Sequence, residues 1–91
     1  MKTIDGFKMR SLGKDYIIVG EGAAQVNFNK MISLNSTAAY LWESVCDKGS
    51  FTIDQLKDLL LAKYNVDAET AARDAAYIAG KWVEFGIAKN E

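Results

Sequence analysis

The stretch Met31-Ile32-Ser33-Leu34-Asn35-Ser36-Thr37-Ala38-Ala39-Tyr40-Leu41-Trp42 joins two kinds of hydrophobic pattern and decides the fold. Residues 25–32 alternate, with Val26, Phe28 and Ile32 on one side of an extended chain, which predicts a strand. Asn35 or Ser36 is then a favourable N-cap, because its side-chain oxygen can accept a hydrogen bond from the first helical turn. The apolar residues that follow at helical spacing are Ala38, Ala39, Leu41, Trp42 and Val45. The sequence therefore predicts a strand that leads directly into a helix.

Two further strands are predicted before this point. Residues 7–12 alternate between apolar and basic side chains, and residues 16–19 form a run rich in β-branched side chains. Gly13-Lys14-Asp15 lies between them and suits a tight turn. The three segments predict an antiparallel meander, which needs helices against it because so small a sheet is not stable alone.

Two more helices are predicted after the first. Thr52 and Gln55 form a capping box for a helix that reaches about Tyr64, and its expected inward positions are Ile53, Leu56, Leu59 and Leu60. Asp67 caps the longest helix, which runs to about Phe85 and ends at Gly86. Its expected buried stripe consists of Ala71, Ala75, Ile78, Ala79, Trp82 and Phe85. A small three-stranded sheet followed by three helices predicts one α+β domain over residues 1–91, with a winged helix-turn-helix-like architecture.

The composition narrows the possible functions. The 91 residues include no His and one Cys. Without His the chain lacks the usual general base at neutral pH and the commonest transition-metal ligand. A single Cys can form neither an internal disulfide nor an ordinary zinc or iron–sulfur site. We therefore expect a chain that is not an enzyme and that carries no metal or cofactor.

The charge and the hydropathy bear on location and partners. Eleven basic and twelve acidic residues give a formal net charge of −1, which provides little attraction to nucleic acid or to an anionic membrane. The sequence shows no apolar stretch of membrane-spanning length and no signal peptide at its start. A cytoplasmic location is the expectation.

The stretch from Met31 to Trp42 resembles the hallmark of the PqqD superfamily, in which an apolar strand end and Leu-Asn precede Ala-Ala and an aromatic-capped helix. The resemblance continues through Val45-Cys46-Asp47 with Gly49, and through Phe51-Thr52-Ile53 with Leu56. Further along, the residues that carry it are Tyr64, Val66, Asp74, Ala75, Ile78, Trp82 and Phe85-Gly86-Ile87.

This resemblance implies a peptide-binding adaptor. Proteins of this kind bind the leader of a ribosomally made precursor peptide and present it to a modifying enzyme, such as the radical S-adenosylmethionine enzyme of pyrroloquinoline quinone synthesis. The leader adds as a strand to the edge of the third strand and lies against the third helix. The corresponding edge residues are Gln25, Val26, Asn27, Phe28, Asn29, Lys30 and Met31. The helix residues beside the core stripe are Arg73 and Tyr77 on one flank, and Asp74 and Lys81 on the other.

Alternative interpretations stay open at this point. The winged architecture also suits a DNA-binding regulator, although the third helix carries more acidic than basic residues. A small enzyme or metal-binding protein is disfavoured by the composition. An open sheet edge would also permit a homodimer through sheet extension. Trp42 and Trp82 are expected to be core residues rather than a peptide pocket, Cys46 a buried small hydrophobe, and Asp74 either a solvated charge or a partner for a basic leader residue.

Overall fold

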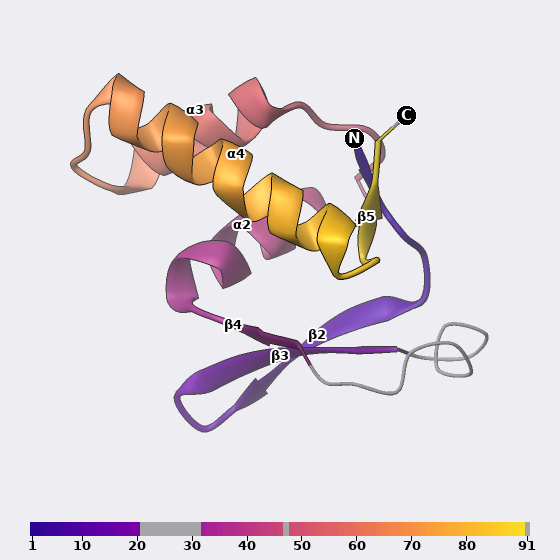
Figure 1. The fold of residues 1–91 in the computed structure, drawn as a ribbon. Helices are drawn as coiled ribbons and strands as arrows, with labels where there is room; N and C mark the ends of the chain where they lie inside the picture. The colour runs from indigo at the N-terminus through magenta and orange to yellow at the C-terminus, as the bar shows by residue number, and fades with distance from the viewer. Residues whose placement is uncertain (21–31, 47, 91) are drawn as a thin grey trace.

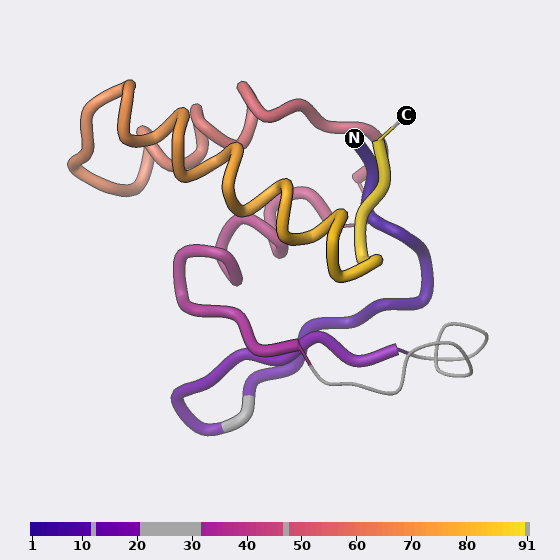
Figure 2. Tube along the Cα trace, in the orientation of Figure 1, coloured from indigo at the N-terminus to yellow at the C-terminus, as the bar shows by residue number. Residues whose placement is uncertain are grey.

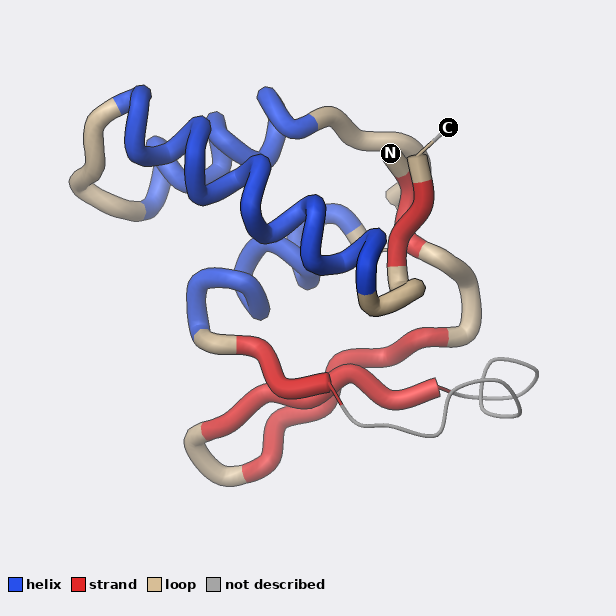
Figure 3. The backbone as a smooth tube through the Cα atoms, in the orientation of Figure 1, coloured by secondary structure: helices blue, strands red, loops and turns tan. Residues whose placement is uncertain are grey.

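The computed structural model describes residues 1–20, 32–46 and 48–90, and they form two small sheets and three helices (Figure 1). In chain order the elements are β1 (Lys2–Thr3), β2 (Phe7–Leu12), β3 (Asp15–Gly20), β4 (Ile32–Leu34), α2 (Ser36–Val45), α3 (Ile53–Lys63), α4 (Ala68–Glu84) and β5 (Ala88–Lys89). Figure 3 shows the strands on one side of the molecule and the helices on the other, apart from the short β1–β5 pair beside the end of α4. The predicted α+β class, with a three-stranded antiparallel sheet followed by three helices, is confirmed.

The larger sheet has the strand order β2-β3-β4, with both pairs antiparallel. Leu12 pairs with Asp15, so the β2–β3 turn has only two residues, and Gly13 adopts a φ of 66° that other residues rarely take. β4 continues to Leu34, two residues beyond the end that we expected at residue 32. The buried, exposed, buried pattern of Ile32, Ser33 and Leu34 is the alternation of a strand with one face on the core.

The second sheet was not predicted. β1 pairs antiparallel with β5, and Ile4 N–H donates to the Ile87 carbonyl at 2.9 Å. Met1 and Phe51 exchange two backbone hydrogen bonds of 2.7 Å, so the beginning of the chain lies between the α2–α3 loop and β5. Figure 2 shows the two ends of the chain side by side as a result. Two-residue strands carry too little pattern to be recognised in a sequence.

The helices form two layers over the sheet. α2 lies against β2, β3 and β4, while α3 and α4 pack on each other on its far side (Figure 1). Ala71, Ala75 and Ala79 give α4 a buried stripe of small side chains, which allows close approach of the neighbouring helix.

Two tryptophans occupy the centre of the core, as predicted. Trp42 and Trp82 are each 1% exposed, and their rings meet edge to face with centroids 5.2 Å apart. Phe51 contacts Trp82 in a second edge-to-face pair at 6.1 Å. Ile87 is fully buried after the turn at Gly86, whose φ is 79°. Cys46 is partly rather than fully buried, and it packs against the core cluster.

Two predicted core positions are wrong. Ile53, in the first turn of α3, is 40% exposed, and Phe85, the C-cap of α4, is 43% exposed. Both residues lie at helix ends. The helical periodicity predicts that they face the core, but none of the described elements covers them fully.

The helix starts follow the predicted caps. Asn35 Oδ1 accepts from Ala38 N–H at 2.8 Å, and Thr52 and Gln55 form the complete capping box. The Asp67 carboxylate accepts from Thr70 N–H at 2.7 Å. Hydrogen bonds from the Thr70 side chain and backbone, with a smaller contribution from the charge of Arg73, hold the pKa of Asp67 below its ordinary value.

Candidate functional site

The candidate site begins at β4, which is the last strand of its sheet. Leu34, Ser33 and Ile32 pair with Tyr16, Ile17 and Ile18 of β3, and β4 has no second strand neighbour within the described parts of the chain. In an antiparallel ladder alternate residues direct their N–H and C=O groups away from the paired neighbour. The outer edge of β4 therefore offers backbone groups to another extended chain.

A groove of about 320 Å³ lies between this strand and α4. We call it the β4–α4 groove. Its residues come from the end of β4 and the cap that follows, from the first turns of α2, and from the C-terminal half of α4; they are Ser33, Leu34, Asn35, Ala38, Tyr77, Ile78, Lys81, Trp82 and Phe85.

The wall that α4 contributes is mostly apolar, and part of it is exposed. Trp82 is buried and Ile78 partly buried, so these two side chains form the base of the wall. Tyr77 is 66% exposed and Phe85 is 43% exposed, so both of these large side chains remain accessible. Exposed aromatic side chains beside an open strand edge provide both backbone and side-chain contacts for a bound segment.

Lys81 supplies the positive charge of the groove. Its Nζ lies 5.6 Å from the centroid of the Tyr77 ring and 3.3 Å from Glu84 Oε2. The Lys81 and Glu84 side chains are 39% and 64% exposed, so their ion pair contributes little stability. The ammonium group has three donors, and it can bind a second acceptor while it keeps Glu84.

The predicted helix residues divide between two environments. Tyr77 and Lys81 both line the β4–α4 groove, although we had expected them on opposite flanks of the helix. Arg73 and Asp74 are exposed on α4 and do not line it, and Arg73 pairs instead with Glu69 at 3.7 Å. The predicted strand residues Gln25, Val26, Asn27, Phe28, Asn29, Lys30 and Met31 lie outside the described residues.

Several residues that line the groove were not predicted for it. The alternation predicts a strand end at Ile32, before Ser33 and Leu34, and the sequence predicts Asn35 only as an N-cap. Periodicity predicts Phe85 in the core, yet it lies four residues from Lys81 and eight from Tyr77. That spacing puts all three on one side of a helix, and it is the signal that could have identified this flank.

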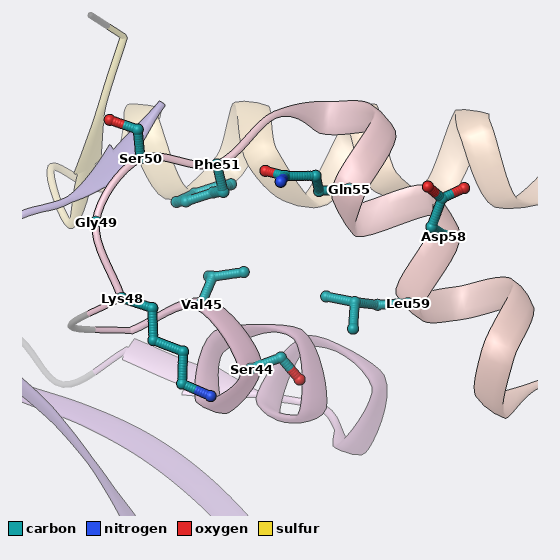
Figure 4. Close-up of a pocket in the computed structure, with 9 residues that line it drawn as sticks. All are labelled: Ser44, Val45, Lys48, Gly49, Ser50, Phe51, Gln55, Asp58 and Leu59. Atoms are coloured by element: carbon teal, nitrogen blue, oxygen red, sulfur yellow. The ribbon is translucent and has the colours of Figure 1, made fainter.

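A larger pocket of about 410 Å³ lies elsewhere, between the end of α2 and the start of α3 (Figure 4). Figure 4 shows Val45, Phe51 and Leu59 around it, with Lys48 and Asp58 among the polar side chains of its lining. Of the predicted site residues that the structure describes, Arg73, Asp74, Tyr77 and Lys81, none lines this pocket.

Two classes of feature are not found in the described part of the chain. Residues 1–20, 32–46 and 48–90 contain no group of three or more His, Cys, Asp or Glu side chains placed to hold a metal ion. No helix within those same ranges has the length and apolar character needed to cross a membrane.

Two solved structures have the same fold. One, described as TbiB1 in complex with the TbiA(beta) leader peptide, superposes with a TM-score of 0.75 at 15% identity, covering 100% of this chain and 98% of the other. The second, lasso peptide synthetase B1 complexed with the leader peptide, has a TM-score of 0.72 at 18% identity, covering 98% and 96%. At these identities the similarity establishes the fold alone.

The sequence comparisons identify the family. A search of curated proteins finds no significant match. The family model described as coenzyme PQQ synthesis protein D (PqqD) matches residues 15–87, which is most of the chain and includes β3, β4 and all three helices. The chain therefore belongs to the PqqD family.

Proposed function

We propose that this protein is a non-catalytic adaptor that binds the leader of a ribosomally made precursor peptide in the β4–α4 groove and presents it to a modifying enzyme. The observation that carries the proposal is the outer edge of β4, which no strand of the described residues pairs with, beside an exposed, largely apolar wall of α4. Family membership and the two structures of the same fold that are described with leader peptides support it.

Strand addition explains how this site can bind a peptide with few specialised side chains. The backbone of the leader would pair with the outer edge of β4 and extend the β2-β3-β4 sheet by one strand. Every second side chain of the leader would then face α4 and contact Tyr77, Ile78 or Phe85. Main-chain hydrogen bonds would provide affinity, and the pockets along α4 would provide selectivity.

We place the chemistry on a partner enzyme. The adaptor brings the precursor to the enzyme and raises its effective concentration there, which increases the rate without a catalytic group in the adaptor. A radical S-adenosylmethionine enzyme is one candidate partner, and a cytoplasmic location fits a protein that handles newly made peptides.

The charges on α4 argue against the DNA-binding alternative. It carries three acidic residues, Glu69, Asp74 and Glu84, against two basic ones, Arg73 and Lys81. A recognition helix needs an excess of basic side chains to attract phosphates, because release of counterions supplies much of the affinity.

The test is a titration of the isotope-labelled protein with the short peptide encoded nearest to its gene. We expect amide shift changes at Ser33 and Leu34 together with changes at Tyr77, Lys81 and Phe85. Two versions of the peptide, N-methylated at odd or at even positions, serve as matched controls. Both keep the side chains, and the version whose methyl groups face β4 cannot form the strand ladder. Binding that leaves β4 unperturbed, or that both N-methylated versions retain, would refute strand addition.

A further inference from the structure

We infer that the β4–α4 groove selects a peptide with a carboxylate side chain flanked, two positions away on each side, by large apolar side chains. This inference rests on the proposed function, and it adds which leader sequences the groove accepts. Three features of the groove support it: the spacing of three side chains along α4, the charge of the middle one and the direction of β4.

The spacing of Tyr77, Lys81 and Phe85 matches an extended peptide. The three residues are four apart along α4, so consecutive members are separated by about 6 Å along the helix axis. Alternate residues of a strand are about 6.6 Å apart and point to the same face. An extended peptide in the groove therefore presents side chains i, i+2 and i+4 to the three positions in turn.

The outer two positions favour apolar side chains. Tyr77 and Phe85 are exposed aromatic residues, and between them Ile78 and Trp82 provide the apolar base of the groove. Covering this surface removes apolar area from water, which favours large apolar side chains at i and i+4 of the peptide.

The middle position favours a carboxylate. Lys81 is the only charged side chain among the described residues that line the groove. Its Nζ lies beside the Tyr77 ring and Glu84, and its side chain is 39% exposed, so the ammonium is accessible to a bound peptide. A carboxylate at i+2 can accept a hydrogen bond from this ammonium, whereas a basic side chain there would meet a like charge.

The direction of the peptide follows from the two elements that form the groove. In Figure 1 β4 and α4 run in roughly opposite directions along the chain. A segment that pairs antiparallel with β4 therefore runs with α4, so its i residue meets Tyr77 and its i+4 residue meets Phe85. An antiparallel arrangement is the one already present between β3 and β4.

The test is selection of a phage-displayed random dodecapeptide library on the full chain. We expect enrichment of Asp or Glu two residues after one large apolar residue and two residues before another. Lys81→Glu should shift the enriched central residue to Lys or Arg, and Lys81→Met should leave the apolar preference without a charge preference. Lys57→Glu makes the same charge change on α3, outside the groove, and should keep the wild-type selection.

Affinities of one enriched peptide then give the size of the effect. Replacing its central Glu by Gln should weaken binding to the wild type by about two- to fivefold, the range for a partly exposed ion pair. The Lys81→Met variant should bind both peptides equally. Enriched peptides that bind this groove without a central acid, or a Glu preference that survives Lys81→Glu, would overturn the specificity and leave the proposed function intact. Selection of no binding peptide would count against the proposed function itself and against this inference with it.

Discussion

Replacing Tyr77 by Ala separates binding from folding in this protein. The Tyr77 side chain is 66% exposed, so its removal exposes little core surface, and we expect the free energy of unfolding to change by less than about 0.5 kcal/mol. An aromatic side chain buries about 150–250 Å² when it is fully covered, so two thirds of that area, or about 130 Å², is available at Tyr77. If a bound peptide covers half of it, about 65 Å² at about 25 cal/mol per Å² gives about 1.6 kcal/mol. The dissociation constant should therefore rise about 15-fold.

The assay for Tyr77→Ala is fluorescence anisotropy with a labelled leader peptide, combined with urea unfolding of the same samples. Tyr77→Phe keeps the ring and should bind nearly as the wild type does. Leu61→Ala removes an exposed apolar side chain of α3 that does not line the groove, and it should not affect binding. A dissociation constant for Tyr77→Ala within twofold of the wild-type value would refute the assignment of this flank to the peptide. If Tyr77→Ala loses binding because the protein is also destabilised, the prediction that this side chain affects binding and not folding is wrong.

Three further predictions concern the fold itself. Trp82→Ala removes a ring that contacts both Trp42 and Phe51, and it should cost about 3–5 kcal/mol in urea unfolding; a loss below about 1 kcal/mol would contradict its place in the core. Gly80→Ala should raise the stability by about 0.5–1 kcal/mol, because an added Cβ within α4 meets no atom within 4 Å. Gly86→Ala should lower the stability by about 1–2 kcal/mol, because φ at Gly86 is 79°. Thermal unfolding that ranks the two variants the other way would contradict the described backbone. Asp67→Ala should lower the free energy of unfolding at neutral pH, because the cap hydrogen bonds stabilise the charged carboxylate. The stability difference from the wild type should shrink as the pH falls through the lowered pKa of Asp67. A stability difference that is constant from pH 7 to pH 2 would show that the carboxylate charge does not contribute.

The helices and the longer strands could be predicted from the sequence because each of them carries its own local signal. The caps at Asn35, Thr52 and Asp67 are short-range hydrogen bonds between residues three apart, and all three form as expected. The two tryptophans follow helical periodicity into the core for the same reason. The two-stranded β1–β5 sheet has no comparable signal, because its strands have two residues each and Lys2 pairs with Lys89 at the other end of the chain.

The flank of α4 that faces β4 was decided by the tertiary structure. Periodicity defines a buried stripe on a helix, but it does not say which of the two neighbouring flanks an adjacent strand will cover. The placement of α4 relative to β4 sets that choice. Tyr77, Lys81 and Phe85 line the groove with β4, while Arg73 and Asp74 stay outside it.

Local chemistry thus determined the class of fold, the helix starts and the buried tryptophans, and the order of its motifs indicated the family. Packing between elements distant in sequence determined the groove, because a groove is made by the relative placement of two surfaces and no single segment encodes it. The charge at its centre illustrates the division. Lys81 is visible in the sequence as one of eleven basic residues, and only its position opposite β4 makes it the residue on which we expect peptide selectivity to depend.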